Sequence, residues 1–171
     1  IIGAGGIGFD VAEFLAHKGE APSLNIDKYL EEWGIDKTYS EGGANQKPQP
    51  EPSPREIYLL KRSGGKHGKG LGKTTGWIHR ASLAMKRVNM ISNVAYEKVD
   101  DKGLHINIDG EKQVLEVDHV VVCAGQEPLR ELYDSLKEKG RNVHLIGGAN
   151  EAAELDAKKA IYEASHLAAA L

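Results

Sequence analysis

Six residues near the N-terminus constrain the fold more than any other part of this 171-residue sequence. They match the pattern G-x-G-x-x-G and read Gly3-Ala4-Gly5-Gly6-Ile7-Gly8. In this pattern the first glycine permits a tight turn, the second lets the backbone approach a pyrophosphate, and the third lets a helix pack closely against a strand. Apolar residues precede the glycines and helical spacing follows them. This context favours a dinucleotide-binding turn over a glycine-rich turn in an unrelated α/β fold.

The helix expected after the turn supplies the anion-binding groups. Its first backbone amides have no partner within the helix and lie at the positive end of the helix dipole, so they suit a pyrophosphate. The candidate contacts to the dinucleotide at this turn are Gly3, Gly5, Gly6, Ile7 and Gly8.

Only Ile1 and Ile2 precede the glycines. A strand normally has about 5–6 residues, so we expect the sequence to begin inside a strand and to be a fragment of a longer protein.

Apolar periodicity predicts the remaining elements. We expect a helix over 9–17, a strand over 56–61, a helix over 77–87 and a strand over 88–91. An antiparallel meander follows over 94–99, 104–108 and 113–117, with an Asp109-Gly110 hairpin turn. A buried parallel strand over 119–123, a helix over 129–139, a strand over 143–146 and a helix over 152–171 complete the chain. The predicted fold is a Rossmann-like α/β fold with a central parallel sheet and a three-stranded antiparallel meander, which replaces a crossover helix.

An insertion over about 20–54 separates the first helix from the second strand. Asn25 is expected to cap a short helix that runs through Trp33 and ends at Gly34, and 42–54 is expected to be loop. Long loops in compact domains are often functional lids, but a tolerated surface excursion explains the insertion equally well.

The second strand ends in basic residues. NAD-binding folds usually place an acid there for the ribose 2′-hydroxyl, whereas a base accommodates a 2′-phosphate. Lys61 and Arg62 therefore indicate that the domain binds NADPH and not NADH, and Arg62 is suited to bidentate phosphate binding. The following segment contains no acid and five bases, namely Lys61, Arg62, Lys66, Lys69 and Lys73. A solvated basic loop is the alternative, and a nucleic-acid patch is disfavoured because no aromatic residue lies within the loop.

Other segments carry weaker signals for a bound ligand. Residues Gly72-Lys73-Thr74 resemble the end of the ATP-binding pattern G-x-x-x-x-G-K-[ST], but the pattern is excluded because His67 stands where its first glycine is required. Trp77 and Arg80 follow this loop and are candidate contacts at the edge of the cofactor. Gly125 and Gly147-Gly148 each follow a predicted strand and precede a predicted helix, which is a setting for a phosphate or a flavin.

Composition limits the remaining classes of function. A net charge of −3 argues against a generally basic nucleic-acid-binding protein, and no segment is long and apolar enough for a membrane span. The single cysteine, Cys123, excludes an internal disulfide and a zinc or iron–sulfur site within this chain. Such cysteine usage suits a reducing compartment, and we expect the cytoplasm. The histidines show no ligand spacing, and no nucleophile–base pair stands out, so no catalytic residue is predicted.

Several segments of the chain carry a family resemblance when they are taken together. Its most specific blocks are Gly70-Leu71-Gly72-Lys73-Thr74-Thr75-Gly76-Trp77-Ile78-His79-Arg80 and Cys123-Ala124-Gly125-Gln126-Glu127-Pro128. Weaker blocks are Glu32-Trp33-Gly34-Ile35-Asp36, His144-Leu145-Ile146-Gly147-Gly148 and Leu155-Asp156-Ala157. Together these segments resemble the C-terminal part of bacterial NADPH-dependent 2,4-dienoyl-CoA reductases, and the resemblance covers nearly the whole chain.

The resemblance implies a larger enzyme related to old yellow enzyme and trimethylamine dehydrogenase. In such enzymes a TIM barrel carries FMN and binds the CoA thioester, a 4Fe–4S cluster lies nearby, and a second module binds FAD. An NADPH module is inserted within the FAD module. By resemblance, 1–126 is the NADP-binding domain, and 127–171, which contains Gly147 and Gly148, is the returning segment of the FAD module.

The resemblance also implies the order of electron transfer. Hydride passes from NADPH to FAD, and electrons then reach FMN through the cluster. The barrel and the first FAD motif lie outside this sequence, so this chain alone is not expected to reduce a dienoyl-CoA. Two alternatives remain open: a related old-yellow-type oxidoreductase with another substrate, and a nucleotide-binding module without a redox role.

Overall fold

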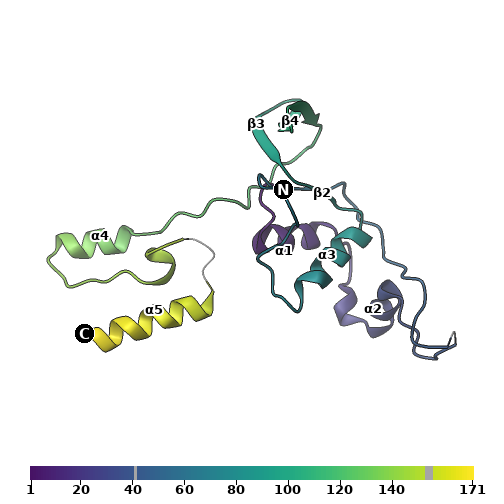
Figure 1. Ribbon diagram of the computed structural model, residues 1–171, viewed down its shortest axis with the longest axis horizontal. Coiled ribbons are helices and arrows are strands. Elements are labelled where there is room, and N and C mark those ends of the chain that lie inside the picture. Colours follow the sequence, from purple (N-terminus) through teal and green to yellow (C-terminus); the bar gives the residue numbers. More distant parts are fainter. Residues whose placement is uncertain (41, 153–155) are drawn as a thin grey trace. The chain divides into compact units, whose positions relative to one another are not determined.

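The computed structural model describes residues 1–40, 42–152 and 156–171. The chain forms two compact units, Ile1–Ala124 and Gly125–Leu171 (Figure 1). This division falls beside the domain boundary expected after Gln126.

A short parallel sheet lies at the centre of the first unit. Strand β1 (Tyr58–Leu60) pairs in parallel with β2 (Asn89–Ile91). On its other side β1 meets Ile2, which forms parallel bridges to both Leu60 and Val122. The residue before the glycine turn therefore lies between two parallel neighbours, as a Rossmann-like fold requires. The predicted Rossmann-like α/β fold is confirmed.

The predicted buried strand over 119–123 is wrong in its length and in its burial. It is reduced to the bridge at Val122, whose side chain is 67% exposed. A β-ladder extends only as far as the partner strand supplies backbone to pair with, and here the pairing is a bridge to Ile2. The backbone of Ile2 supplies two bonds here, by donating to Val121 and accepting from Cys123. The predicted strand over 143–146 is also wrong, because these residues adopt no regular secondary structure.

Two helices cover the parallel sheet and build its core. Helix α1 (Gly6–Leu15) begins inside the glycine motif, three residues before its predicted start at Phe9. Helix α3 (Gly76–Met85) follows the basic loop, which comprises residues 62–75, as predicted. The core beneath them is formed by buried apolar side chains of both helices and of β1, chiefly Phe9, Ala12, Leu59 and Leu83.

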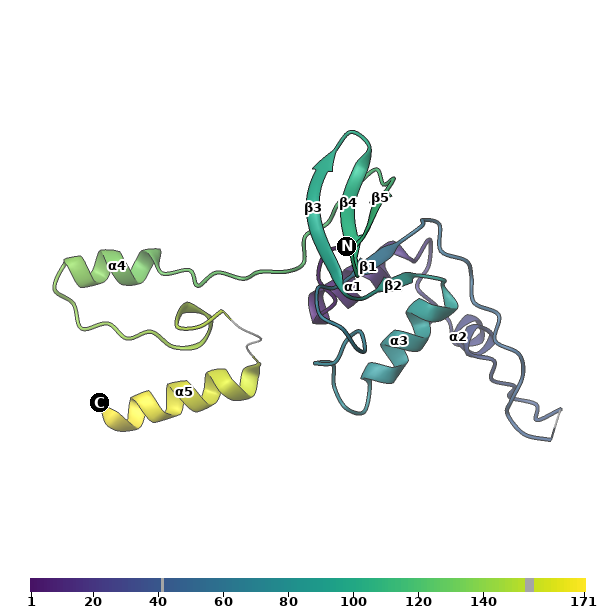
Figure 2. The same ribbon diagram turned by 45° about the horizontal axis from the view of Figure 1, so that its top comes forward.

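The antiparallel meander is confirmed in all three strands. It consists of β3 (Val94–Asp100), β4 (Gly103–Ile108) and β5 (Glu111–Leu115), in the spatial order β3-β4-β5 (Figure 2). Asp109 and Gly110 both have positive φ, 51° and 94°, as a two-residue type I′ hairpin turn requires. A second core, which contains Leu60, Val94, Leu104 and Ile106, joins the meander to β1.

The insertion over 20–54 contains folded structure. A 3-10 helix η1 (Pro22–Leu24) precedes α2 (Ile26–Trp33). The side chain of Asn25 accepts a hydrogen bond from the Lys28 amide, and Gly34 ends the helix at φ 68°, so both predicted boundaries of α2 are confirmed.

The second unit consists of α4 (Glu131–Glu138), the 3-10 helix η2 (Gly147–Ala149) and α5 (Ala157–Ala170). The predicted helix over 152–171 begins later, at Ala157, because the Asp156 side chain caps the Lys159 amide. Residues 153–155 of that prediction lie outside the described residues, and with them Leu155 of the resemblance block. Among its described residues, this unit contains no fully buried apolar side chain.

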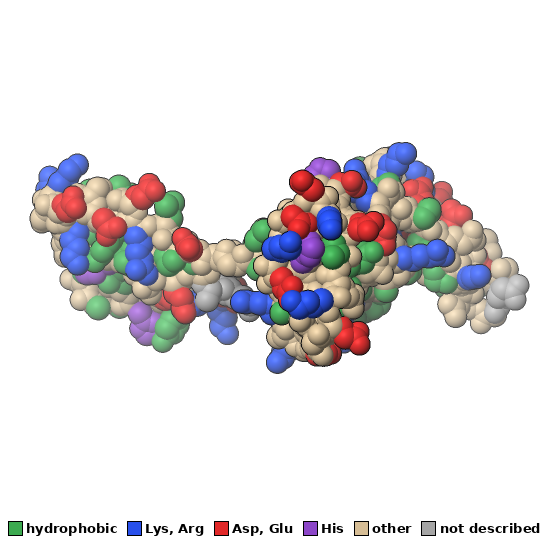
Figure 3. Space-filling view, turned by 90° about the horizontal axis from the view of Figure 1, so that it is seen from above, with side chains coloured by type: hydrophobic (Ala, Val, Ile, Leu, Met, Phe, Trp, Pro, Cys, Tyr) green, Lys and Arg blue, Asp and Glu red, His purple; other side chains and the backbone are tan. Residues whose placement is uncertain are grey.

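The surface carries charges of both signs. Figure 3 shows basic and acidic side chains interspersed over the face in view, which accords with the net charge of −3. Within the described parts of the chain, no helix has the length and apolar character needed to cross a membrane.

Candidate dinucleotide-binding site

The glycine turn is held tightly between its neighbours at two positions. Gly3 has φ 109°, and a Cβ atom there would lie 2.6 Å from the carbonyl oxygen of Cys123. A Cβ atom at Gly8 would overlap the carbonyl oxygen of Gly3. Both glycines are therefore needed for the turn itself and for the close packing of α1 against the strand residues.

The middle of the motif is open. A Cβ atom added at Gly5 or Gly6 would meet nothing within 4 Å, and the Ile7 side chain is 52% exposed. No side chain caps α1, and the amide of Phe9 donates to the carbonyl of Gly5 at 3.1 Å. The amides of the first turn before Phe9 therefore have no carbonyl four residues back inside the helix. This open space and these donors fit a pyrophosphate.

The loop over 62–75 lies directly beside the glycine turn. The amide of Gly68 donates to the carbonyl of Ala4 at 3.2 Å, and the guanidinium of Arg80 donates to the carbonyl of Gly68 at 3.4 Å. The structure therefore brings the basic loop and the glycine motif together, as a site for two phosphate groups of one ligand requires.

Lys61 and Arg62 differ in their surroundings. The Nζ atom of Lys61 donates to the carbonyl of Lys66 at 3.0 Å, so this ammonium holds the loop that follows it. The side chain of Arg62 is exposed. No acidic residue occurs between Glu56 and Glu97, so the sequence offers no carboxylate for a ribose 2′-hydroxyl at the end of β1.

Trp77 and Arg80 lie on α3 but contact different neighbours. Trp77 meets Trp33 of α2 edge-on, with the ring centroids 6.4 Å apart, and remains 58% exposed. Arg80 contacts the basic loop through Gly68. The neighbouring His79 has its Nδ1 atom 2.8 Å from Oε1 of Glu13 on α1.

His67 is the residue of the site that sequence reasoning missed. Sequence analysis used it only to exclude an ATP-binding loop and gave it no role in the site, yet its side chain is buried within a loop that is mostly exposed. The ring lies against backbone carbonyls of β1 and β2. The sequence offered only a weak signal for it, a histidine within the Gly- and Lys-rich segment that follows the predicted strand over 56–61.

The glycines of the second unit form separate local structures. Gly125 has φ 81° and Gly147 has φ 58°, so both adopt a backbone conformation that favours glycine. The amide of Gly147 donates to Oε2 of Glu163 on α5 at 2.7 Å, so a carboxylate of the chain itself occupies this donor. Gly148 is half-buried in η2. A flavin contact at these three glycines stays a prediction.

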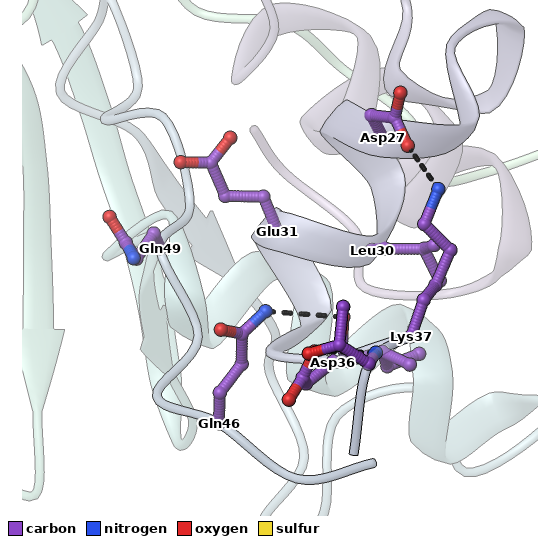
Figure 4. A pocket seen from close by; sticks show the side chains of 9 residues that line it. Asp27, Leu30, Glu31, Asp36, Lys37, Gln46 and Gln49 are labelled. Atoms are coloured by element: carbon purple, nitrogen blue, oxygen red, sulfur yellow. Dashed lines mark hydrogen bonds and ion pairs between the residues drawn. The ribbon is translucent and has the colours of Figure 1, made fainter. Parts of the chain in front are cut away.

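The insertion carries a pocket of about 300 Å³ between α2 and the segment after it (Figure 4). Its polar groups largely bind one another. Nζ of Lys37 lies 2.5 Å from Asp27, and the Gln46 amide donates to the carbonyl of Ile35. Hydrogen bonds from the hydroxyls and amides of Ser40 and Thr38 hold the pKa of Asp36 well below its usual range. In the described residues no group of His, Cys, Asp or Glu is arranged to hold a metal ion.

One protein family matches most of the chain, and two reductases are similar to parts of it. The pyridine nucleotide-disulphide oxidoreductase family matches residues 1–155. A metal reductase of Desulforamulus reducens is 23% identical over 154 residues, which cover 87% of this chain and 21% of that protein. A mercuric reductase of Staphylococcus aureus is 37% identical over 51 residues, which cover 28% of this chain and 9% of that protein.

A solved structure has the same fold. The complex of 2-naphthoyl-CoA reductase with 2-naphthoyl-CoA superposes with a TM-score of 0.60 and 20% identity, over 95% of this chain and 19% of that one. The chain spans about a fifth of the length of this structure and of the metal reductase. The match over 1–155 shows that the chain belongs to the pyridine nucleotide-disulphide oxidoreductase family, whose domain binds NAD(P)H and FAD.

Proposed function

We propose that this chain is the NADPH-binding part of a larger flavin-dependent reductase. The observation that carries the proposal is the hydrogen bond between Gly68 and Ala4, which joins an acid-free basic loop to the glycine turn. A ligand with a pyrophosphate and a ribose 2′-phosphate matches this pair of neighbouring anion sites.

Each part of the site has a distinct task in this proposal. The amides of Gly5, the N-cap residue of α1, and of Gly6 and Ile7 in its first turn bind the pyrophosphate. Arg62 binds the 2′-phosphate, and Lys61 stabilises the basic loop by donating a hydrogen bond to the carbonyl of Lys66. When bound, NADPH supplies a hydride to FAD. The protein groups orient the cofactor and carry none of the bond changes.

The second unit is proposed to be the returning segment of the FAD module. Its described residues bury no apolar side chain fully, while Leu132 is 72% exposed and Ile161 is 64% exposed. Helices with uncovered apolar side chains gain little stability on their own. This supports a unit completed by other parts of the same polypeptide, with Gly125, Gly147 and Gly148 near the flavin.

For the whole protein we propose reduction of 2,4-dienoyl-CoA in the cytoplasm, with FMN and a 4Fe–4S cluster in a TIM barrel of the same polypeptide. The sequence resemblance supports this substrate. The similar fold of a reductase crystallised with 2-naphthoyl-CoA supports a CoA thioester more generally. That structure and the metal reductase also favour the second candidate, a related flavoprotein with another substrate.

Anaerobic mixing of the full-length protein with each nicotinamide cofactor tests the proposal. We expect NADPH to bleach the flavin absorbance rapidly and NADH to do so at least about tenfold more slowly at equal subsaturating concentration, a difference of ~1.4 kcal/mol. Subsequent addition of a 2,4-dienoyl-CoA should restore the absorbance. Binding of NADPH without bleaching would favour a nucleotide-binding module without a redox role. Bleaching without reoxidation by the dienoyl-CoA would favour another substrate.

A further inference from the structure

The imidazole of His67 is buried although most of the loop around it is exposed. His67 is 7% exposed, whereas Lys66 before it and Lys69 after it in the sequence are exposed. Its Nε2 atom lies 3.1 Å from the carbonyl oxygen of Leu59 and 3.2 Å from that of Ile91. Leu59 belongs to β1 and Ile91 ends β2, so one ring atom ties the loop to two adjacent parallel strands.

The chemistry of this contact specifies the state of the ring. Both neighbours of Nε2 are carbonyl oxygens, which only accept, so Nε2 must carry the proton and donate it. Burial lowers the pKa of His67, and the nearby Lys61 ammonium lowers it further, so the neutral ring is the stable form. His67 is therefore a neutral donor shared between two strands.

The residue after His67 connects the same loop to the glycine turn. Gly68 donates its amide to Ala4 and accepts the guanidinium of Arg80 at its carbonyl. Its φ is 63°, and a Cβ atom there would lie 2.5 Å from Cδ1 of Leu71 and 2.9 Å from Cε2 of Phe9. His67 and Gly68 together fix the middle of the loop against the sheet, α3 and the glycine turn.

We propose that His67 is a positioning residue that sets the distance between the basic loop and the glycine turn, and thereby the preference for a ligand with a 2′-phosphate. This inference rests on the proposed function, since it concerns the same nucleotide site. NADPH must reach the turn and the loop bases at once, whereas NADH has no 2′-phosphate and depends on the turn alone. A loop released from the two strands weakens the contact that only NADPH makes.

Calorimetric titration of the intact protein with NADPH and with NADH tests this role, using His67→Leu and His67→Gln. Leucine fills the space without a donor, whereas the Gln amide nitrogen can replace Nε2. We expect His67→Leu to weaken NADPH binding about tenfold, equivalent to ~1.4 kcal/mol, and to change NADH binding by less than about twofold. His67→Gln should keep most of the wild-type preference. His17→Leu is the matched control, because Nε2 of His17 also contacts a carbonyl, that of Gly19 at 3.0 Å, outside this loop.

The outcomes separate the two proposals. Wild-type protein that binds NADPH and NADH equally would overturn the proposed NADPH function, and this inference with it. A wild-type preference that persists in His67→Leu would overturn the positioning role alone. Equal loss in His67→Leu and His67→Gln would also overturn it, since the donor would then be irrelevant. If His67→Leu fails to fold by circular dichroism, His67→Asn, whose amide is too short to reach both strands, takes its place with the same expected loss.

Discussion

The Nζ atom of Lys86 lies 2.8 Å from Oε1 of Glu32, and the two side chains are only 8% and 10% exposed. Glu32 belongs to α2 in the insertion, and Lys86 caps the C-terminus of α3. The same ammonium also donates to the carbonyl of Glu51. With the edge-on contact of Trp33 and Trp77, this ion pair makes the insertion a fixed part of the first unit.

Removal of one partner from this buried pair should destabilise the first unit. We expect Glu32→Gln to lower the free energy of unfolding by about 3 kcal/mol, because the Lys86 charge is left buried without its counter-ion. Denaturant unfolding measures the change. The exposed pair of Lys37 and Asp27 is the control, and Lys37→Met should cost less than about 1 kcal/mol. If Glu32→Gln lowered the free energy of unfolding by no more than Lys37→Met does, the ion pair of Glu32 and Lys86 would not stabilise the packing of the insertion.

Alanine at two glycines of the motif should have opposite consequences. Gly8→Ala places a Cβ atom on the carbonyl oxygen of Gly3, so we expect the variant to unfold or to lose most of its stability. Gly5→Ala meets open space and should change stability by no more than about 1 kcal/mol. It should nevertheless weaken NADPH binding, because its methyl group occupies the space where the pyrophosphate approaches. Thermal unfolding and calorimetry measure the two effects. Binding by Gly5→Ala at wild-type strength would contradict the assigned position of the pyrophosphate.

Acid should destabilise the loop through His67. Burial lowers the pKa of this ring below its ordinary value near 6.5. The unfolded chain then binds a proton more readily than the folded one, so the contribution to stability is present above pH 6.5 and is lost as the pH falls through the folded pKa. We expect the stability of the wild type to fall more than that of His67→Gln between pH 7.5 and pH 5. Parallel curves for the two proteins would contradict a buried neutral His67.

The second unit should open far more readily than the first. Its α4 helix has eight residues, and no apolar side chain in the described part of the unit is fully buried, whereas β4 contributes Leu104 and Ile106 to a core. Hydrogen exchange of the 171-residue chain should therefore be fast in α4 and slow in β4. In the full-length protein, α4 should become protected. Equally slow exchange in both elements of the shorter chain would contradict the proposal that other segments complete this unit.

The sequence was sufficient wherever a local rule determines the structure. Asn25 and Gly34 bound α2, Asp109 and Gly110 turn the hairpin, and Gly3 and Gly8 have the steric reasons that the motif predicts. These features depend on the conformation of one residue and its immediate neighbours, so a pattern in the sequence identifies them.

Features that depend on contacts between residues far apart in the sequence could not be predicted. The apolar run around Val122 indicated a buried strand, but a strand needs partner backbone along its length, and among the described residues the bridge of Val122 to Ile2 is the pairing that this segment forms. The role of His67 depends on carbonyls of two strands, and the attachment of the insertion depends on Lys86, far along the chain from Glu32. None of these pairings leaves a periodic signal in the sequence.

The proposed 2′-phosphate site at Arg62, beside the glycine turn, is tested most directly by titrating wild-type protein and Arg62→Gln with NADPH and NADH in a calorimeter. We predict that the wild type binds NADPH at least about tenfold more tightly than NADH, a difference of ~1.4 kcal/mol. Arg62→Gln should lose most of this difference and bind NADH as before. Equal affinities in the wild type, or an unchanged preference in Arg62→Gln, would contradict the claim.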